Sequence, residues 1–274
     1  MKKISLITLI AAFSFVLLAC GKEETSAEDK AFFTGEPGET FVVGLDETFV
    51  VGLDDTFVPM GFRDNEGNLV GLDIDLATEA ADRLGMEVAF QPIDWAMKET
   101  ELNSGNIDVI WNGYSVTKER KEKVDFTTPY LSGGQIFVVM ADSPINNWED
   151  LEEKVVASQQ SSSTVDLLKN HESGIVEIFE GQDVIQYPSY NDVFNDLESG
   201  RSDAAAVSEL YARYYMKQKG IEKYRVLEER FAEENTAVGV RKSDTVFLEK
   251  LNDVLADMEK DGTLAEIKDK WIAE

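Results

Sequence analysis

The sequence predicts an α/β protein of two similar halves, each built on an open sheet with helices on its faces. Three observations support this fold class. Short apolar runs alternate with stretches whose apolar residues recur at helical spacing, in the order strand, helix, strand, helix, strand. The same order occurs a second time, and two further helical stretches close the chain. Such alternation is typical of open α/β sheets, whose ligands bind beyond the carboxyl ends of the strands.

The chain begins with the pattern of an export signal. Lys2 and Lys3 precede an apolar run at 4–18, which has signal-peptide length and is short for a membrane span. The run ends in Leu-Leu-Ala-Cys, which resembles a lipobox, the signal of bacterial lipoproteins. The resemblance implies a signal peptide at 1–19 and a lipid anchor, with palmitate, on Cys20. The alternative is an uncleaved anchor helix, and both interpretations place the protein outside the cytoplasm, tied to a membrane.

Composition narrows the choice of partners. Residues 20–39 are polar and charged and cannot bury enough apolar surface to fold alone, so we expect a flexible tether. The formal net charge of −27 argues against binding to nucleic acid or, through charge, to an anionic membrane surface. Cys20 is the only cysteine, which excludes an intrachain disulfide. Because the protein as a whole is strongly negative, an anionic ligand would need a positively charged side chain close to it in order to bind.

The first strand is predicted from a tandem repeat of eight residues. The unit Thr-Phe-Val-Val-Gly-Leu-Asp-Glu at 40–47 returns with one change at 48–55. Only the second copy runs directly into the next apolar segment, so we expect it to be the core strand. The first copy is then an edge strand, a disordered extension or a competitor for the same register.

The remaining elements of the first half follow from periodicity and stop signals. Apolar residues at helical spacing, with Gly85 as the stop, predict the first helix. In chain order we expect a turn, a helix, a strand, a helix and a strand at 63–68, 72–85, 86–90, 95–102 and 107–111.

The stretch at 110–130 is the one around which the rest of the chain is organised. It starts at the end of an apolar strand and offers small or polar groups at Asn112, Gly113 and Ser115. Arg120 follows shortly after, and its planar guanidinium is suited to a carboxylate. We therefore predict a receptor for a small carboxylic acid. The alternative is that Arg120 is a solvated helix residue within its Lys-Glu-Arg-Lys run.

The second half repeats the pattern and contains a second candidate loop. The polar loop at 159–163 precedes a helix start, where unpaired N–H groups can bind an anion; a plain linker is the alternative. Crossings between the halves are predicted near 130–134 and 233–237, and the final helices return to the first half. Strands are expected at 134–140, 154–158, 176–179, 203–207 and 237–240, and helices at 147–151, 164–169, 193–197, 209–219, 247–258 and 264–272.

Several motifs occur together over 48–274, and any one of them alone would be a weak signal. They are GLDDTFVPMGF, GNLVGLDIDLATEAADRLG, QPIDW, LNSGNIDVIWNGYSVTKERKEKVDFTTPY, WEDLEEKVVASQQSSST and DGTLAEIKDKW. In this order they resemble the bacterial extracellular solute-binding proteins, family 3, of polar amino acid ABC importers. The resemblance implies a periplasmic-binding-protein-like fold, in which two α/β lobes with open mixed sheets share a two-strand hinge and close on the ligand. One lobe would comprise 40–131 and 235–274, and the other 132–234.

The resemblance implies roles at the carboxylate end of the ligand. Arg120 is similar to the Arg that pairs with the α-carboxylate, and the Ser115 hydroxyl lies beside it. Gly113 would supply backbone contacts to the amino group, and Ser163 a backbone N–H to the carboxylate. Asn112 belongs to the same predicted ligand-binding set.

Three more residues match the side-chain end of the ligand. Phe57 and Trp95 are similar to the aromatic pair that sandwiches the ligand side chain, and Asp54 to an acidic residue that takes its polar group. The alternatives are core aromatics for Phe57 and Trp95 and a turn residue for Asp54.

Two positions depart from the family pattern. Members usually carry an Asp that binds the α-ammonium where this chain has Ser208, followed by Glu209. A Ser cannot neutralise an ammonium, so either Glu209 or Asp54 reaches it or the ligand is not an ordinary α-amino acid. A helix N-terminal acid is the alternative for Glu209. Gln159 stands where some members carry a Lys.

The implied function is capture of a polar amino acid, or a close analogue, at the extracellular face of the cell membrane of a Gram-positive bacterium. The protein would be a monomer, would deliver its ligand to an ABC permease, and would need no cofactor or metal. The sequence offers no Ser-His-Asp set, cysteine nucleophile or His/Cys cluster, so we expect no enzyme activity. The alternatives are a dehydratase-like enzyme for small carboxylic acids, with Glu209 or Asp54 as its acid, and a ligand sensor on the same fold.

Overall fold

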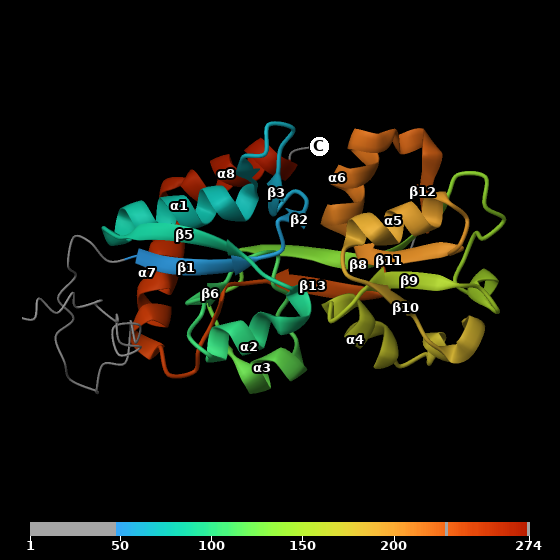
Figure 1. The fold of residues 1–274 in the computed structure, drawn as a ribbon, viewed down its shortest axis with the longest axis horizontal. Coiled ribbons are helices and arrows are strands. Elements are labelled where there is room, and N and C mark those ends of the chain that lie inside the picture. The colour runs from blue at the N-terminus through green and yellow to red at the C-terminus, as the bar shows by residue number, and fades with distance from the viewer. Residues whose placement is uncertain (1–47, 228–229, 273–274) are drawn as a thin grey trace, which may run out of the picture. The chain divides into compact units, whose positions relative to one another are not determined.

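The computed structural model describes residues 48–227 and 230–272, which belong to one compact unit. They form two α/β lobes connected by a pair of strands (Figure 1), so the predicted two-lobed fold with open mixed sheets is confirmed. We call 48–130 with 237–272 lobe 1, and 131–236 lobe 2. The predicted signal peptide, the lipidated Cys20, the tether and the first copy of the repeat lie outside the described residues.

Lobe 1 is built on a five-stranded mixed sheet in the order β5-β1-β6-β14-β7. The second copy of the repeat forms β1, which pairs in parallel with β5 and β6, as predicted for the core strand. β14 returns from the far end of the chain and pairs antiparallel with β6 and β7. The bounds are β1 Thr48–Leu53, β5 Glu87–Pro92, β6 Val109–Ile110, β7 Asp125–Phe126 and β14 Gly239–Val240.

Successive side chains of β1 point to opposite faces of the sheet and join two separate buried clusters. Phe49, Val51 and Leu53 join a buried cluster with the helices α1, α7 and α8, whereas Val50 packs against a second cluster on the opposite face, which includes α2. Gly85 ends α1 in the left-handed conformation, as its predicted stop role requires. The helices are α1 Leu72–Leu84, α2 Lys98–Asn103, α3 Lys118–Lys123, α7 Thr245–Asp261 and α8 Thr263–Ile272.

A small antiparallel sheet of three short strands leaves the end of β1 and carries Phe57 toward lobe 2. The predicted turn at 63–68 connects its last two strands. The bounds are β2 Thr56–Phe57, β3 Gly61–Arg63 and β4 Leu69–Val70.

Lobe 2 has a second mixed sheet in the order β10-β9-β11-β8-β12, and β13 pairs with β8. Ile136 and Val138 pack with α5 and α6, and Phe137 and Val139 with α4 and the 3-10 turns. The strands are β8 Leu131–Met140, β9 Val156–Gln159, β10 Ile185–Tyr187, β11 Ala204–Ser208, β12 Tyr224–Val226 and β13 Ala232–Thr236. The helices are α4 Ser163–Lys169, α5 Tyr190–Glu198 and α6 Glu209–Lys219. The 3-10 turns within 48–227 and 230–272 are Trp95–Met97, Glu149–Leu151, Ile175–Ile178, Glu180–Gln182 and Ile221–Lys223.

The strand predicted at 176–179 is wrong. These residues fall in a 3-10 turn, Ile175–Ile178, that follows Gly174 in the left-handed conformation, and the sheet takes its edge strand from β10 instead. Ile175 and Val176 are buried against the core of lobe 2. A run of four residues is too short for its period to separate a strand from a buried turn.

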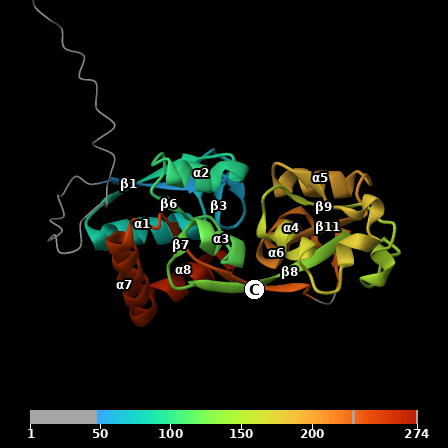
Figure 2. The same cartoon turned by 90° about the horizontal axis from the view of Figure 1, so that it is seen from below.

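Two crossing strands, β8 and β13, connect the lobes and lie side by side in both views (Figures 1 and 2). They pair antiparallel from Leu131 with Thr236 to Gln135 with Ala232. The segment after β6 also joins this pair, because Val116 N–H donates to the carbonyl of Asn235 at 2.8 Å. Both crossings were predicted from the sequence. In the part of the chain that the structure describes, every helix is too short or too polar to cross a membrane.

Candidate functional site

A cavity lies between the two lobes, at the carboxyl end of β1 and beside the crossing strands. All of the predicted ligand-binding residues except Glu209 line it. The lining residues are Asp54, Phe57, Trp95, Asn112, Gly113, Ser115 and Arg120 from lobe 1, and Gln135, Gln159, Ser162, Ser163, Tyr190, Ser208 and Glu234 from lobe 2.

Arg120 supplies the positive charge of the cavity. Its side chain is only 3% exposed, which contradicts the alternative of a solvated helix residue. Nη1 donates to the carbonyl of Ser115 at 3.0 Å, and the guanidinium lies 4.5 Å from the ring centroid of Tyr114. Among residues 48–227 and 230–272, no carboxylate lies within ion-pair distance of it. A buried cation without a counter-ion is costly, and an anionic ligand would supply the missing partner.

The Thr117 hydroxyl fixes the helix that carries Arg120. It accepts a hydrogen bond from the backbone N–H of Arg120 at 3.1 Å and thereby caps α3. The cap sets where α3 begins, and so directs the guanidinium back toward Ser115.

Asp73, in the first turn of α1, holds the turn at Gly113 in place through a hydrogen bond. One carboxylate oxygen of Asp73 accepts from the backbone N–H of Gly113 at 2.6 Å, and the other from the hydroxyl of Tyr130 at 2.7 Å. Burial raises the pKa of Asp73 to about 7, although these two hydrogen bonds lower it. An ammonium group only donates hydrogen bonds, so Gly113 would contact a ligand amino group through its carbonyl while its N–H stays bound to Asp73.

Gly113 also has a conformation that only glycine adopts easily. Its φ is 58°, and a Cβ atom there would lie 2.5 Å from Cε1 of Phe57. The ring of Phe57 has no room to retreat, because it stacks on Tyr211 of lobe 2 at 5.5 Å and lies 5.8 Å from Tyr190. The close approach of the turn to Phe57 therefore requires glycine.

The two predicted aromatics are both packed and exposed to the cavity. Trp95 is 7% exposed and meets Tyr114 edge to face at 6.0 Å, within the second buried cluster of lobe 1. Phe57 packs across the cleft on the tyrosines of lobe 2. The core role and the lining role are thus combined in the same side chains.

Asp54 and Gln159 meet across the cleft. Gln159 Nε2 donates to one carboxylate oxygen of Asp54 at 2.8 Å and to the carbonyl of Pro188 at 3.0 Å. The other oxygen of Asp54 accepts from the backbone and the hydroxyl of Thr56, at 2.9 and 2.6 Å. Asp54 therefore already has donors on both oxygens, one of them from the opposite lobe.

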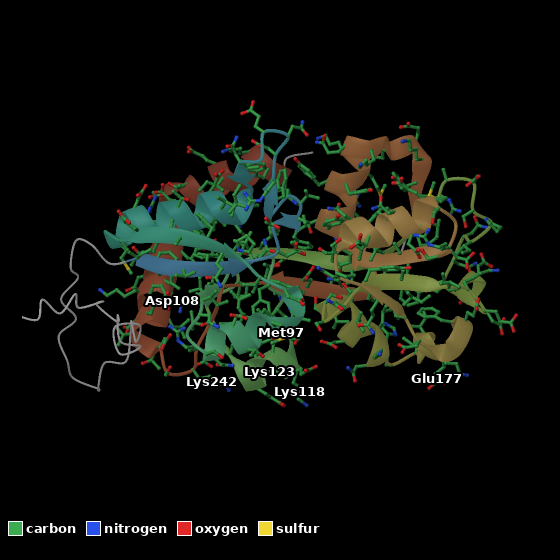
Figure 3. The ribbon with its side chains drawn as sticks, viewed as in Figure 1. Met97, Asp108, Lys118, Lys123, Glu177 and Lys242 are labelled. Carbon is green, nitrogen blue, oxygen red and sulfur yellow. The ribbon has the colours of Figure 1, made fainter. Side chains whose placement is uncertain are left out.

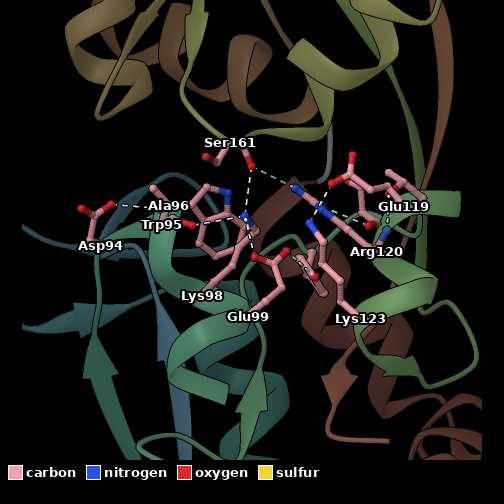
Figure 4. Close-up of polar contacts among 12 residues, drawn as sticks. Asp94, Trp95, Ala96, Lys98, Glu99, Glu119, Arg120, Lys123 and Ser161 are labelled. Carbon is pink, nitrogen blue, oxygen red and sulfur yellow. Dashed lines mark hydrogen bonds and ion pairs between the residues drawn. The ribbon is translucent and has the colours of Figure 1, made fainter. Parts of the chain in front are cut away.

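A second contact between the lobes centres on the carbonyl of Ser161, which we call the Ser161 clasp (Figure 4). Lys98 Nζ donates to this carbonyl at 3.0 Å, and Arg120 Nη2 lies 3.4 Å from it. Lys98 also bonds the carbonyl of Trp95 and pairs with Glu99 at 3.4 Å. Burial and the charge of Arg120 lower the pKa of Lys98 to about 8. Sequence reasoning missed Lys98, because a lysine at a helix start is ordinarily solvated.

The predicted polar loop leads into α4, which begins at Ser163. Ser162 caps this helix, and its hydroxyl accepts from the backbone N–H of Val165 at 3.4 Å. The hydroxyls of Ser163 and Ser115 lie 2.8 Å apart and form a hydrogen bond between the lobes.

Glu234 of β13 is a lining residue that sequence reasoning missed. Its side chain is buried and accepts hydrogen bonds from the hydroxyls of Ser115 and Ser208. Burial raises the pKa of Glu234, while the two hydroxyls and the charge of Arg120 lower it. The signal was present in the sequence: alternation along a crossing strand turns one of two adjacent glutamates inward.

Glu209, by contrast, lies outside the lining of the cavity. Its carboxylate forms ion pairs with Arg213 at 2.5 Å and Arg230 at 2.6 Å. These pairs match the alternative of a structural acid at a helix start. The carboxylate beside Ser208 comes from Glu234 of the crossing strand β13 instead of from Glu209.

Comparison with known proteins agrees with this arrangement. The family model described as bacterial extracellular solute-binding proteins, family 3, matches residues 49–274. The L-cystine-binding protein TcyJ of Escherichia coli (strain K12) is 34% identical over 215 residues, 78% of each chain.

Two solved structures extend the comparison. An ABC uptake transporter substrate binding protein from Streptococcus pneumoniae, solved with bound histidine, is 38% identical with a TM-score of 0.80. The match covers 83% of this chain and 93% of that one. An ancestral amino acid-binding protein, described as a precursor of cyclohexadienyl dehydratase, is 32% identical with a TM-score of 0.74, over 82% of this chain and 95% of that one.

Proposed function

This chain belongs to the bacterial extracellular solute-binding proteins, family 3, and on that premise we propose that it captures a polar amino acid between its lobes for delivery to an ABC importer. The observation that carries the proposal is the buried guanidinium of Arg120, which lines the cavity without a carboxylate partner among the described residues. A ligand carboxylate would accept two parallel hydrogen bonds from it. The names of relatives, with cystine and histidine as their ligands, support the amino acid class.

Capture would depend on both lobes. Lobe 1 offers Arg120, together with Asn112, whose buried Nδ2 has no hydrogen-bond partner in the described structure. Lobe 2 closes the site with Gln159 on Asp54 and Ser163 on Ser115. Because only the closed arrangement brings both sets to the ligand, binding shifts the population toward closure.

The side-chain end of the ligand would lie near Phe57, Trp95 and the Asp54–Gln159 pair. Apolar surfaces can hold the stem of a ligand, while an acid and an amide hold its polar group. A polar side chain fits this combination better than a purely aliphatic one.

The remaining parts of the proposal concern the setting of the protein. Cleavage before Cys20 and lipidation of its sulfur would anchor a monomer to the outer face of the cell membrane. If residues 20–39 form the tether predicted from the sequence, they would let the lobes reach the permease. A Gram-positive source is consistent with such an anchor.

The test is a thermal-shift screen of the purified protein against the common amino acids, followed by calorimetry on Arg120→Ala. A ligand at 100 times its Kd raises the stability of the fold by about 2.7 kcal/mol. Arg120→Ala should weaken binding by about a hundredfold or more, as for broken buried ion pairs of about 3–5 kcal/mol. Arg63→Ala, at a half-exposed arginine paired with Asp55, is the matched control. Undiminished binding by Arg120→Ala would contradict the site.

A dehydratase-like enzyme is the second candidate. It is favoured by one observation, the raised pKa of the Glu234 carboxyl in the cavity, which general acid chemistry would use. Of the two acids proposed for it from sequence, Glu209 lies outside the cavity lining and Asp54 belongs to it. Prolonged incubation with small hydroxy acids, followed by chromatography, tests it: unchanged substrate counts against an enzyme.

A further inference from the structure

We infer that Glu234 pairs with the α-ammonium of the ligand and thereby makes the cavity select α-amino acids over plain carboxylic acids. The inference rests on the proposed function, in which Arg120 holds the carboxylate of an amino acid. It assigns the opposite charge of the zwitterion to a residue on a crossing strand.

The charged groups that line the cavity identify the candidate. Within the described ranges, the charged lining residues are Asp54, Arg120 and Glu234. Asp54 already accepts hydrogen bonds on both oxygens, from Thr56 and Gln159. Glu234 also accepts on both oxygens, from the hydroxyls of Ser115 and Ser208, but it is the carboxylate that shares Ser115 with Arg120.

Glu234 lacks a cation. Its side chain is 7% exposed, and no Lys, Arg or His nitrogen of the described residues lies within ion-pair distance of it. Two hydroxyl donors compensate part of the cost of burying a carboxylate, and a positive charge would offset the rest. Burial accordingly raises the pKa of Glu234, and a bound ammonium would lower it.

Arg120 and Glu234 are placed on either side of one residue. Ser115 accepts from Arg120 Nη1 through its carbonyl at 3.0 Å, and its hydroxyl donates to Glu234. Two opposite charges that both contact the same small residue are close enough to hold the carboxylate and the ammonium of one Cα atom. A carboxylic acid without the amine would leave Glu234 unpaired. It would also place the negative charge of the ligand carboxylate near that of Glu234.

Ser208 explains why the carboxylate comes from β13. It ends β11 beside the cavity, and its hydroxyl donates to Glu234 Oε2 at 3.2 Å. A serine hydroxyl carries no charge and cannot neutralise an ammonium, so Ser208 instead orients Glu234 of β13, a strand that β8 separates from β11. Glu209, the next residue, is occupied by two arginines.

The experiment compares amino acids with their des-amino analogues by calorimetry on the purified protein. The probe pairs are L-histidine with imidazolepropionate, L-arginine with guanidinovalerate, L-glutamine with glutaramate, and L-cystine with dithiodipropionate. The wild type should bind at least one amino acid about a hundredfold more tightly than its analogue. Glu234→Gln should lose about that factor for the amino acid and less than about threefold for the analogue.

The matched control is Glu233→Gln. It removes the same charge from the adjacent position of β13, but its side chain is 77% exposed and faces away from the cavity, so both affinities should stay within about twofold. Adding Ser208→Asp to Glu234→Gln returns a carboxylate to the same place and should restore most of the discrimination.

The outcomes separate this inference from the proposed function. If no amino acid binds the wild type, the proposed function fails and this inference fails with it. If amino acids bind, but Glu234→Gln weakens acid and amino acid equally or leaves both unchanged, only the role of Glu234 is overturned. Circular dichroism checks that the variant folds; if it does not, Glu234→Ala replaces it, and an unchanged ratio of the two affinities would likewise overturn the role.

Discussion

Gly113 shows how a single residue determines the shape of the cavity. Gly113→Ala would combine an unfavourable positive φ with a Cβ only 2.5 Å from Phe57. Strain of this kind costs about 1–3 kcal/mol, and displacement of Phe57 should weaken ligand binding by about tenfold. Urea unfolding and calorimetry measure the two effects.

The control for this substitution is Gly105→Ala. Gly105 also has a positive φ, 75°, but a Cβ there would meet no atom within 4 Å. It should therefore lower stability through backbone strain while ligand affinity is retained. Equal losses of affinity in the two variants would contradict the role of the Phe57 contact.

Residue identities in the cavity were predictable where a short motif carries them. Asn112, Gly113, Ser115 and Arg120 are close in sequence, so local spacing was enough to group them. Glu234 was missed because its position depends on pairing with β8, far away in the chain. Glu209 was included among the predicted ligand-binding residues for its position next to Ser208, since the arginines that bind it could not be located from sequence.

At the scale of elements, Asp73 connects the start of α1 to the turn after β6. Its folded pKa of about 7 lies above the ordinary value of 3.8, so the folded state binds this proton more tightly than the unfolded chain. Stability from this group is complete below pH 4 and is lost as pH rises toward 7. A difference of about three between the two pKa values corresponds to about 4 kcal/mol.

Asp73→Asn removes this titration. The stability advantage of the wild type over the variant should therefore shrink between pH 4.5 and pH 7.5, as measured by urea unfolding at several pH values. Asp82→Asn, at an exposed position on the same helix, is the control and should show no such trend. A pH-independent difference for Asp73→Asn would contradict the raised pKa.

Long elements with a clear period were predicted well, and short ones were not. The helices α1 and α7 have apolar residues at helical spacing over three or more turns, and Gly85 and Gly262 mark their ends. The run at 176–179 lacks that length, and its apolar residues are equally suited to a buried turn. Tertiary packing against Phe137 and its neighbours decided the outcome.

At the scale of the whole molecule, the Ser161 clasp links the two lobes near the cavity. Lys98→Met removes the donor at 3.0 Å and keeps the length of the side chain. Ligand affinity should fall by about three- to tenfold, because the closed arrangement loses an interlobe contact. The stability of the unliganded protein should change little, since burying the ammonium also carries a desolvation cost.

Calorimetry measures the ligand affinity of the variant, and thermal unfolding measures the stability of the unliganded protein. Lys118→Met is the control, because Lys118 lies on the outer surface of α3 (Figure 3). An affinity for the ligand that Lys98→Met leaves unchanged would show that the clasp does not contribute to closure.

The two-lobed organisation itself was predictable, because the strand and helix order occurs twice and its crossings are set by strand positions. The contacts across the cleft were not predictable. Gln159 on Asp54, Ser163 on Ser115 and Lys98 on Ser161 each join residues that only the folded lobes bring together.

The pairing of β8 with β13 has a mechanical consequence. Five residue pairs, from Leu131 with Thr236 to Gln135 with Ala232, share the connection. A bend spread along such a ladder needs only a small dihedral change at each pair. The change in angle between the lobes would therefore be shared by all five pairs, with no single hinge residue. Because the cavity lies beside this ladder, a bend along it would draw the lining residues of one lobe away from those of the other while each lobe keeps its own internal packing.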